Sequence, residues 1–238
     1  MSDEIKISKQ SLWKYSTFVL LAAIIIIAAF YIFPSNAGNN GGTTGTEDLS
    51  AFVSNPGLYP SLGPDNAENV VIEFSDFQCP YCTMASGIPS WVSQYASQYG
   101  DLIGVGQKLA EMAQNGDIKF VYVPMSFLGQ ESVYAAEAGY CANEQDKFWE
   151  MHDAIFKASD GPTENDGKYT KAKLKTIATG ISGLDKTKFN SCLDSSKYLS
   201  AVQTAASQAS AVVSGTPSFF VNGEKVSPGW TSIQAALK

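Results

Sequence analysis

The chain contains 238 residues with a formal net charge of −7, and 45% of its residues are hydrophobic and 12% aromatic. This composition suffices for one sizeable domain with a buried core and excludes intrinsic disorder for most of the chain. All 16 basic residues are lysines, whereas nucleic-acid binding needs a clustered basic surface and favours arginine, so nucleic acid is excluded as a partner.

The first predicted element is a membrane helix over the apolar run of residues 15–33. About 19 residues at a rise of about 1.5 Å each match the hydrocarbon thickness of a bilayer. The nearby positive charges all precede the run: Lys6, Lys9 and Lys14. Since such charges stay in the cytoplasm, we expect residues 1–14 to be cytoplasmic, residues 15–34 to be a single-pass anchor, and the rest to be extracytoplasmic.

Two alternatives exist for this segment. One is a helix in the core of the protein, which an unbroken apolar run of this length disfavours. The other is a cleaved signal peptide, because Ser35, Asn36 and Ala37 have the small-residue pattern of a cleavage site, although the apolar part of a signal peptide is usually about 7–15 residues long. An anchor and a signal peptide both export the remaining chain to a compartment where disulfides persist.

A linker is expected after the anchor. Residues 35–46 are rich in glycine, asparagine and threonine and carry no charge, which is typical of a flexible segment. We place the linker at residues 35–55 and one domain at residues 56–238.

The domain begins with a predicted strand–helix–strand unit. Residues 70–76 form an apolar, β-branched run, a helix is expected from about Tyr81, and residues 118–125 form a second strand after an Asn-Gly turn. Two strands joined through a helix pair in parallel.

A helical block, about residues 130–214, is predicted to interrupt the sheet. Phe148, His152 and Phe156 recur at helical spacing, which we interpret as a packed core face, and Asp185 is a candidate N-cap. The sheet resumes with strands at residues 218–223 and 224–226, joined by an Asn-Gly hairpin, and a last helix is expected at residues 231–238.

Cys79 and Cys82 form a C-x-x-C motif between the first strand and its helix. The unpaired N–H groups and the dipole at a helix N-terminus favour a thiolate, so Cys79 is the expected nucleophile and Cys82 the resolving thiol. Pro80 suits the first helical turn. A zinc site would need two further ligands, and a copper carrier would show methionine or histidine clusters, so both are weaker alternatives.

Three segments resemble the DsbA-like thiol-disulfide oxidoreductases. These segments are residues 73–82 around C-P-Y-C, the helix of residues 148–152, and residues 215–223 with their Thr-Pro. The resemblance covers residues 69–238 and implies an α/β thioredoxin fold with an inserted helical domain, here preceded by one N-terminal transmembrane helix.

The resemblance also implies roles for single residues. Thr216 and Pro217 correspond to the cis-proline loop that faces the cysteines and binds substrate, together with Pro80 and Tyr81 beside Cys79. The alternative for Thr216 and Pro217 is an ordinary turn. Glu73 corresponds to a buried acid beneath the dithiol that accepts the proton of Cys82. The alternative for Glu73 is a carboxylate that faces solvent at a strand edge.

Two features depart from the family pattern. Tyr81 stands where the best-known oxidising members have histidine, so we expect a reduction potential between those of the strongest oxidant, about −120 mV, and thioredoxin, about −270 mV. Residues 101–115 form a longer connection than usual, which we expect to be a peripheral helical extension.

The remaining cysteines, Cys141 and Cys192, both fall in the helical block. Because an isolated thiol pair tends to oxidise outside the cytoplasm, we expect a structural disulfide between them, with two unpaired buried thiols as the alternative.

The sequence therefore predicts an enzyme, a protein thiol-disulfide oxidoreductase that introduces disulfides into exported proteins and uses no cofactor or metal. Its expected partners are exported proteins with free thiols and a membrane thiol oxidase that reoxidises it. The alternatives are a disulfide reductase or isomerase, and a non-catalytic metal- or peptide-binding module of the same fold.

Overall fold

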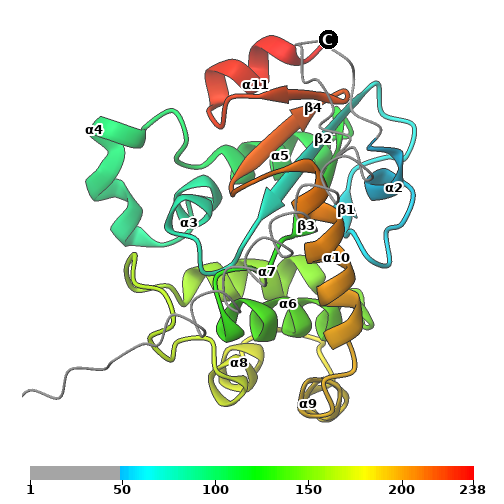
Figure 1. Ribbon diagram of the computed structural model, residues 1–238, viewed down its shortest axis with the longest axis vertical. Helices are drawn as coiled ribbons and strands as arrows, with labels where there is room; N and C mark the ends of the chain where they lie inside the picture. Colours follow the sequence, from blue (N-terminus) through cyan, green and yellow to red (C-terminus); the bar gives the residue numbers. More distant parts are fainter. Residues whose placement is uncertain (1–48) are drawn as a thin grey trace, which may run out of the picture. The chain divides into compact units, whose positions relative to one another are not determined.

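The computed structural model describes residues 49–238, which contain a five-stranded sheet with helices on both faces and a block of helices at one end (Figure 1). The predicted cytoplasmic segment, the anchor and most of the predicted linker lie outside the described residues. The strands are ordered β1 (Ser61–Leu62), β3 (Ile118–Pro124), β2 (Asn69–Ser75), β4 (Ser218–Val221) and β5 (Glu224–Val226). β2 and β3 pair in parallel, and the other pairs are antiparallel.

β2 is the central strand, and its apolar composition follows from burial on both faces. Val71 faces the side covered by α3 (Pro80–Ser86), α5 (Val105–Asn115) and α11 (Trp230–Ala236). Ile72 and Phe74 face the opposite side, covered by α10 (Leu199–Val212) and α2 (Ser50–Val53). Alternate residues of β2 therefore point to different helices, and the cysteines of α3 lie over the face that includes Val71.

The packed domain begins inside the predicted linker. α2 contributes Phe52, which is buried and whose ring centroid lies 4.9 Å from that of Tyr59 and 5.0 Å from that of Phe74. Residues 50–53 thus belong to the folded part of the chain. α2 has only four residues, about one helical turn, which is too short to show periodicity, so the sequence pattern did not indicate this helix.

The connection between α3 and β3 consists of a short 3-10 helix η1 (Ser90–Tyr95), then α4 (Ala96–Tyr99) and α5. The expectation of a peripheral helix at residues 101–115 is wrong, because Val105, Leu109 and Ala113 of α5 are buried against the sheet. The segment that projects beside α3 in Figure 1 is the preceding one, η1 and α4.

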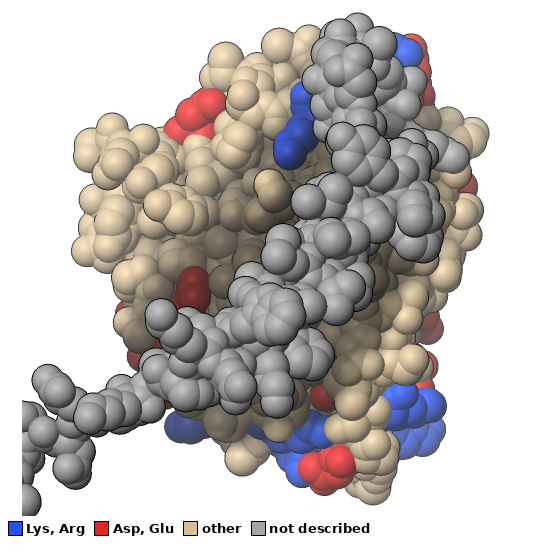
Figure 2. Space-filling view, in the orientation of Figure 1, with Lys and Arg blue, Asp and Glu red and all other residues tan. Residues whose placement is uncertain are grey.

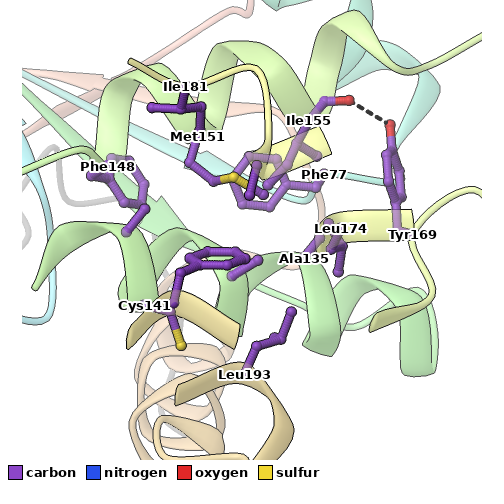
Figure 3. Packing of buried hydrophobic residues seen from close by; sticks show 14 of the residues in the cluster. Phe77, Ala135, Cys141, Phe148, Met151, Ile155, Tyr169, Leu174, Ile181 and Leu193 are labelled. Atoms are coloured by element: carbon purple, nitrogen blue, oxygen red, sulfur yellow. Dashed lines mark hydrogen bonds between the residues drawn. The ribbon is translucent and has the colours of Figure 1, made fainter. Parts of the chain in front are cut away.

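The helical block comprises α6 (Gln130–Asn143), α7 (Phe148–Lys157), α8 (Lys171–Ala178) and α9 (Lys186–Asp194), and leads into α10. The predicted N-cap is correct, since the Asp185 carboxylate accepts the N–H groups of Thr187 and Lys188. Figure 3 shows the core of this block, in which Phe77 from the loop after β2 lies among Met151 and Ile155 of α7. The block is thus packed directly onto the segment that carries the cysteines.

No helix within residues 49–238 has the length and apolar character required to cross a membrane.

Candidate active site

Cys79 and Cys82 lie at the start of α3, just after the loop that follows β2. Cys79 is the N-cap residue with extended backbone angles, and Pro80 occupies the first helical position. Proline costs little there because its missing N–H would have no partner within the helix. Both thiols are free, Cys82 is fully buried, and Cys79 is only 5% exposed. Both cysteines are therefore shielded from solvent, Cys82 more completely than Cys79.

The surroundings of Cys79 favour its ionised form. The largest effect is a hydrogen bond from the Cys82 thiol, which, with smaller contributions from Thr216 and the N–H groups of Cys82 and Tyr81, lowers the Cys79 pKa from 9.0 to about 7 against the opposing effect of burial. A substantial fraction of Cys79 is therefore thiolate at neutral pH, and the thiolate is the nucleophilic form.

Cys82 has the opposite electrostatic character. Burial raises its pKa well above the ordinary value, and the neighbouring Cys79 raises it further. The backbone N–H of Asp76 lies 3.4 Å from Cys82 Sγ and donates to it. The pair thus consists of one acidic thiol, Cys79, and one more deeply buried thiol, Cys82, that needs a proton acceptor before it can react.

The loop before β4 faces the cysteines. The Thr216–Pro217 peptide bond is cis, and the Thr216 carbonyl oxygen accepts a hydrogen bond of 3.5 Å from the Cys79 thiol. The Thr216 hydroxyl is buried and has no hydrogen-bond partner among the described residues. The structure therefore brings Thr216 and Pro217 together with Cys79, although 137 residues separate Thr216 from Cys79 in the chain.

Glu73 lies on β2 below the dithiol. It is only 4% exposed, on the central strand of the sheet and not at an edge. Burial, with a smaller contribution from the charge of Cys79, raises the Glu73 pKa from 4.5 to about 7. Glu73 also lines a cavity of about 290 Å³ whose wall includes His152 and Asp153. A carboxyl group with this pKa exchanges protons readily near neutral pH.

The surface beside Cys79 is aromatic and uncharged. Tyr81 is 46% exposed, and its ring meets that of Tyr99 from α4 edge to face at 5.5 Å. No charged residue occurs between Asp76 and Asp101. Figure 2 accordingly shows few coloured side chains over α3 and α4 at the upper left, whereas charged residues gather at the helical block below.

The sequence did not indicate the role of Asp76 in this site. Its buried carboxylate accepts hydrogen bonds from the Gln78 N–H, the Ser132 hydroxyl, and the N–H groups of Phe127 and Leu128. These donors come from the cysteine loop, from the loop after β3 and from α6. Asp76 therefore joins three segments that lie far apart in sequence.

Gln78 extends this network into the helical block. Its side-chain amide donates to Ser132 Oγ and Asn165 Oδ1 and accepts the Asn165 N–H at 2.7 Å. The two polar residues that flank Phe77, just before the first cysteine, were the available sequence pattern, but their partners could not be identified from it.

The remaining cysteines form a disulfide. Cys141 of α6 and Cys192 of α9 are bonded with their Cα atoms 5.8 Å apart. This bond lies inside the helical block and links two of its helices. Within residues 49–238, no three histidine, cysteine or acidic side chains converge as ligands for a metal ion.

Comparison with known proteins finds a matching family model and several similar curated proteins. A family model described as thioredoxin matches residues 103–238, which include the Thr216–Pro217 loop and begin after the two cysteines. A Bacillus anthracis protein named "Probable disulfide bond formation protein D" is 27% identical over 180 residues, covering 74% of this chain and 76% of that protein. "Disulfide bond formation protein D" of Bacillus subtilis is 26% identical over 191 residues, covering 79% and 78% of the respective chains.

The crystal structure of oxidised BdbD from Bacillus subtilis has a similar fold. Its superposition gives a TM-score of 0.59 at 23% identity and covers 76% of this chain and 92% of that chain.

Proposed function

We propose, from the premise that this chain belongs to the thioredoxin family, that it introduces disulfide bonds into exported proteins through Cys79 and Cys82. The predicted thioredoxin-like fold with an inserted helical block is confirmed. The chain is a thiol-disulfide oxidoreductase of the DsbA-like type, as its sequence predicted. The direction of the reaction, the roles of the single residues and the location of the protein are our proposals.

The observation that carries the oxidising direction is the presence of two different cysteine pairs. Cys141 and Cys192 are joined in a structural disulfide, whereas Cys79 and Cys82 are in a site that stabilises a thiolate. A structural disulfide persists where thiols are oxidised, and in such a compartment the Cys79–Cys82 pair is held as a disulfide that can be donated. Stabilising the Cys79 thiolate stabilises the reduced form of the enzyme and makes its disulfide a stronger oxidant.

In the proposed reaction, a thiolate of the client protein attacks Cys79 Sγ of the Cys79–Cys82 disulfide. The Cys79–Cys82 bond breaks, Cys82 leaves with the electron pair, and the Glu73 carboxyl group provides the proton that Cys82 then takes up. A second client thiolate attacks the client sulfur of the mixed disulfide and releases Cys79 as a thiolate. The client has lost two electrons, and the enzyme dithiol has gained them.

Client binding is assigned to Thr216, Pro217, Pro80 and Tyr81. The Thr216 carbonyl lies at hydrogen-bond distance from Cys79 Sγ, so a client backbone that pairs with this loop brings its cysteine to the reacting sulfur. The exposed Tyr81 ring and the uncharged surface beside it offer apolar contact to an unfolded segment without a charge requirement. Such a surface is compatible with many clients.

We place the protein in the cell membrane with residues 49–238 outside the cytoplasm. The apolar run of residues 15–33 has three lysines just before it and none after it until Lys108, which supports a single-pass anchor. Each client oxidation leaves a dithiol, so a membrane thiol oxidase is the expected partner that removes the electrons.

The test is the redox state of Cys79 and Cys82 in intact cells, trapped by acid and then alkylated. An oxidase is mostly disulfide at rest, and Cys82→Ala accumulates client mixed disulfides through Cys79 while Cys79→Ser does not. A resting dithiol, or a potential near that of thioredoxin at about −270 mV, would indicate a reductase or isomerase instead. Unchanged client oxidation in Cys79→Ser would indicate a binding module.

A further inference from the structure

Ser75 is a buried polar residue to which the mechanism above gives no role. It is the last residue of β2, its side chain is fully buried, and its hydroxyl has no hydrogen-bond partner among the described residues. Buried hydroxyl groups are normally paired because leaving water without a new partner is unfavourable. An unpaired hydroxyl at a reactive site is therefore a candidate for a function that appears only during the reaction.

The geometry of the sheet locates this hydroxyl. Ser75 and Glu73 are two residues apart on one strand, so their side chains point to the same face. Tyr122 is the register partner of Glu73 on β3 and shares that face. Cys82 lies next to this end of β2, because the N–H of Asp76, the residue after Ser75, donates to Cys82 Sγ at 3.4 Å. The hydroxyl thus lies in a cluster with the Glu73 carboxyl group and the Cys82 sulfur.

Electrostatics supports this placement. The Ser75 hydroxyl lowers the pKa of Glu73 and that of Cys82, because it lies close enough to stabilise either group once that group is ionised, although in the resting state it has no hydrogen-bond partner among the described residues. It acts likewise on the buried Tyr122, whose own hydroxyl has no partner among the described residues. A hydroxyl group both donates and accepts, so Ser75 is suited to serve either neighbour according to which one is ionised.

We propose that the Ser75 hydroxyl relays the proton between Cys82 and Glu73, which rests on the proposed function of the dithiol. When Cys82 leaves as a thiolate, the Ser75 hydroxyl gives its proton to Cys82 Sγ, and Ser75 Oγ receives the proton of the Glu73 carboxylic acid. One S–H bond forms, one carboxylic O–H bond breaks, and Ser75 is unchanged.

In the reverse direction the same atoms move the proton outward. The Cys82 thiol passes its proton through Ser75 Oγ to the Glu73 carboxylate, and the resulting Cys82 thiolate attacks Cys79 Sγ of a mixed disulfide. The leaving thiolate takes the electron pair of the broken bond. Because the Glu73 pKa is about 7, the carboxyl group can act as donor or acceptor near neutral pH.

The experiment uses the full reduced chain and oxidised glutathione, with rapid quenching across a pH series. Formation of the Cys79–glutathione mixed disulfide requires only the Cys79 thiolate. Its resolution requires that Cys82 lose its proton, because the Cys82 thiolate is the attacking group. We expect Ser75→Ala to slow resolution by about tenfold, within the range of general acid–base effects, while formation changes by less than about twofold. Ser75→Thr, which keeps the hydroxyl, restores resolution.

A matched control is Ser86→Ala on α3, since Ser86 is also buried but its hydroxyl donates to the Thr83 carbonyl. Both rates should stay near the wild-type values in this variant. In addition, Ser75→Ala should have no further effect in a Glu73→Gln background, because a relay needs both groups. Thermal melts check that all variants are folded, and removing an unpaired hydroxyl is not expected to lower the stability.

Resolution in Ser75→Ala with the wild-type rate and pH profile would overturn the relay. A loss of resolution rate in Ser75→Ala that Ser75→Thr fails to restore would also overturn it. So would rate losses of Ser75→Ala and Glu73→Gln that add up in the double variant. Failure of the proposed function looks different. In that case the wild-type chain itself shows no Cys79–Cys82 disulfide on treatment with glutathione, or oxidises no client.

Discussion

Cys79 owes its acidity more to the thiol next to it than to the helix end on which it lies. The sequence predicted a thiolate from the N–H groups and the dipole of the helix N-terminus. In the structure these backbone groups contribute, but the hydrogen bond from Cys82 is the largest lowering effect and burial opposes it. The ionisation of the two thiols is therefore linked, and a substitution at Cys82 must alter the Cys79 pKa.

We accordingly predict that Cys82→Ala raises the Cys79 pKa from about 7 toward its ordinary value of 9.0. A rise of one unit lowers the thiolate fraction at about pH 6 by about tenfold, so alkylation of Cys79 by iodoacetamide should slow by about that factor. The pH dependence of the alkylation rate measures the shift. Cys82→Ser is the matched control, because its hydroxyl still donates and should keep the pKa lower than in Cys82→Ala.

Glu73 gives a second prediction, on stability. Its pKa is about 7 in the folded protein and 4.5 ordinarily, so between these pH values the folded state binds more protons than the unfolded state. The stability that depends on protonated Glu73 is fully present below about pH 4.5 and is lost as the pH rises through about 7. Above about pH 7, ionisation of the buried Glu73 carboxyl group therefore lowers the free energy of unfolding of the wild type by about 3 kcal/mol.

Glu73→Gln removes this titration. We expect the variant to gain up to about 3 kcal/mol over the wild type near pH 8 and very little near pH 4.5. Urea unfolding of the reduced proteins at both pH values measures the difference. An equal difference at the two values would contradict a raised Glu73 pKa. The same variant should resolve mixed disulfides more slowly.

At the scale of the elements, the sequence indicated what periodicity and local chemistry determine. The apolar run at β2 and the Cys-Pro step into α3 are local patterns, and both elements form where the pattern places them. Asp76 differs, because its partners Phe127, Leu128 and Ser132 lie more than 50 residues away. A hydrogen-bond network of this kind depends on the tertiary fold, and no pattern along the chain specifies it.

α5 illustrates a different limit. Its amphipathic character was compatible with a helix on the surface or on the sheet, and only the packing of Leu109 against the sheet decides between them. Likewise, the position of Thr216 near Cys79 came from the family resemblance and not from any pattern within this chain. The site residues inside the family motifs, such as Cys79 and Thr216, were therefore predictable. The distant hydrogen-bond partners of Asp76, which lie outside those motifs, were not.

The disulfide between α6 and α9 supplies the prediction for this scale. Cys141 and Cys192 are separated by 51 residues, and closing a loop of this size stabilises the folded state by about 4 kcal/mol in the chain-entropy model. The double variant Cys141→Ala, Cys192→Ala should lose about that much in urea unfolding. Its Cys79 alkylation profile should be unchanged, since the bond lies inside the helical block. A fully stable double variant would contradict the structural role.

At the scale of the whole molecule, the dithiol lies where the sheet domain meets the helical block. Phe77 packs its ring 5.2 Å from that of Phe156, and Gln78 bonds to Asn165, so residues directly before Cys79 are held by the block. The active-site loop is thus fixed from both sides. Residues 49–238 contain every group that the proposed reaction requires, whereas the location of the reaction depends on the anchor that we propose in the preceding residues.

This division gives the last prediction, on residues 1–34. If they anchor the protein, the full chain should sediment with membranes, and a membrane-impermeant maleimide added to reduced intact cells should label Cys79. Deleting residues 1–34 should release a soluble protein whose purified form keeps the Cys79 alkylation profile, because the site lies wholly within the folded domain. A mature product that is soluble and shorter than the full chain would indicate a cleaved signal peptide. Protection of Cys79 from the maleimide in intact cells would contradict the proposed location, because the thiol would then be on the cytoplasmic side.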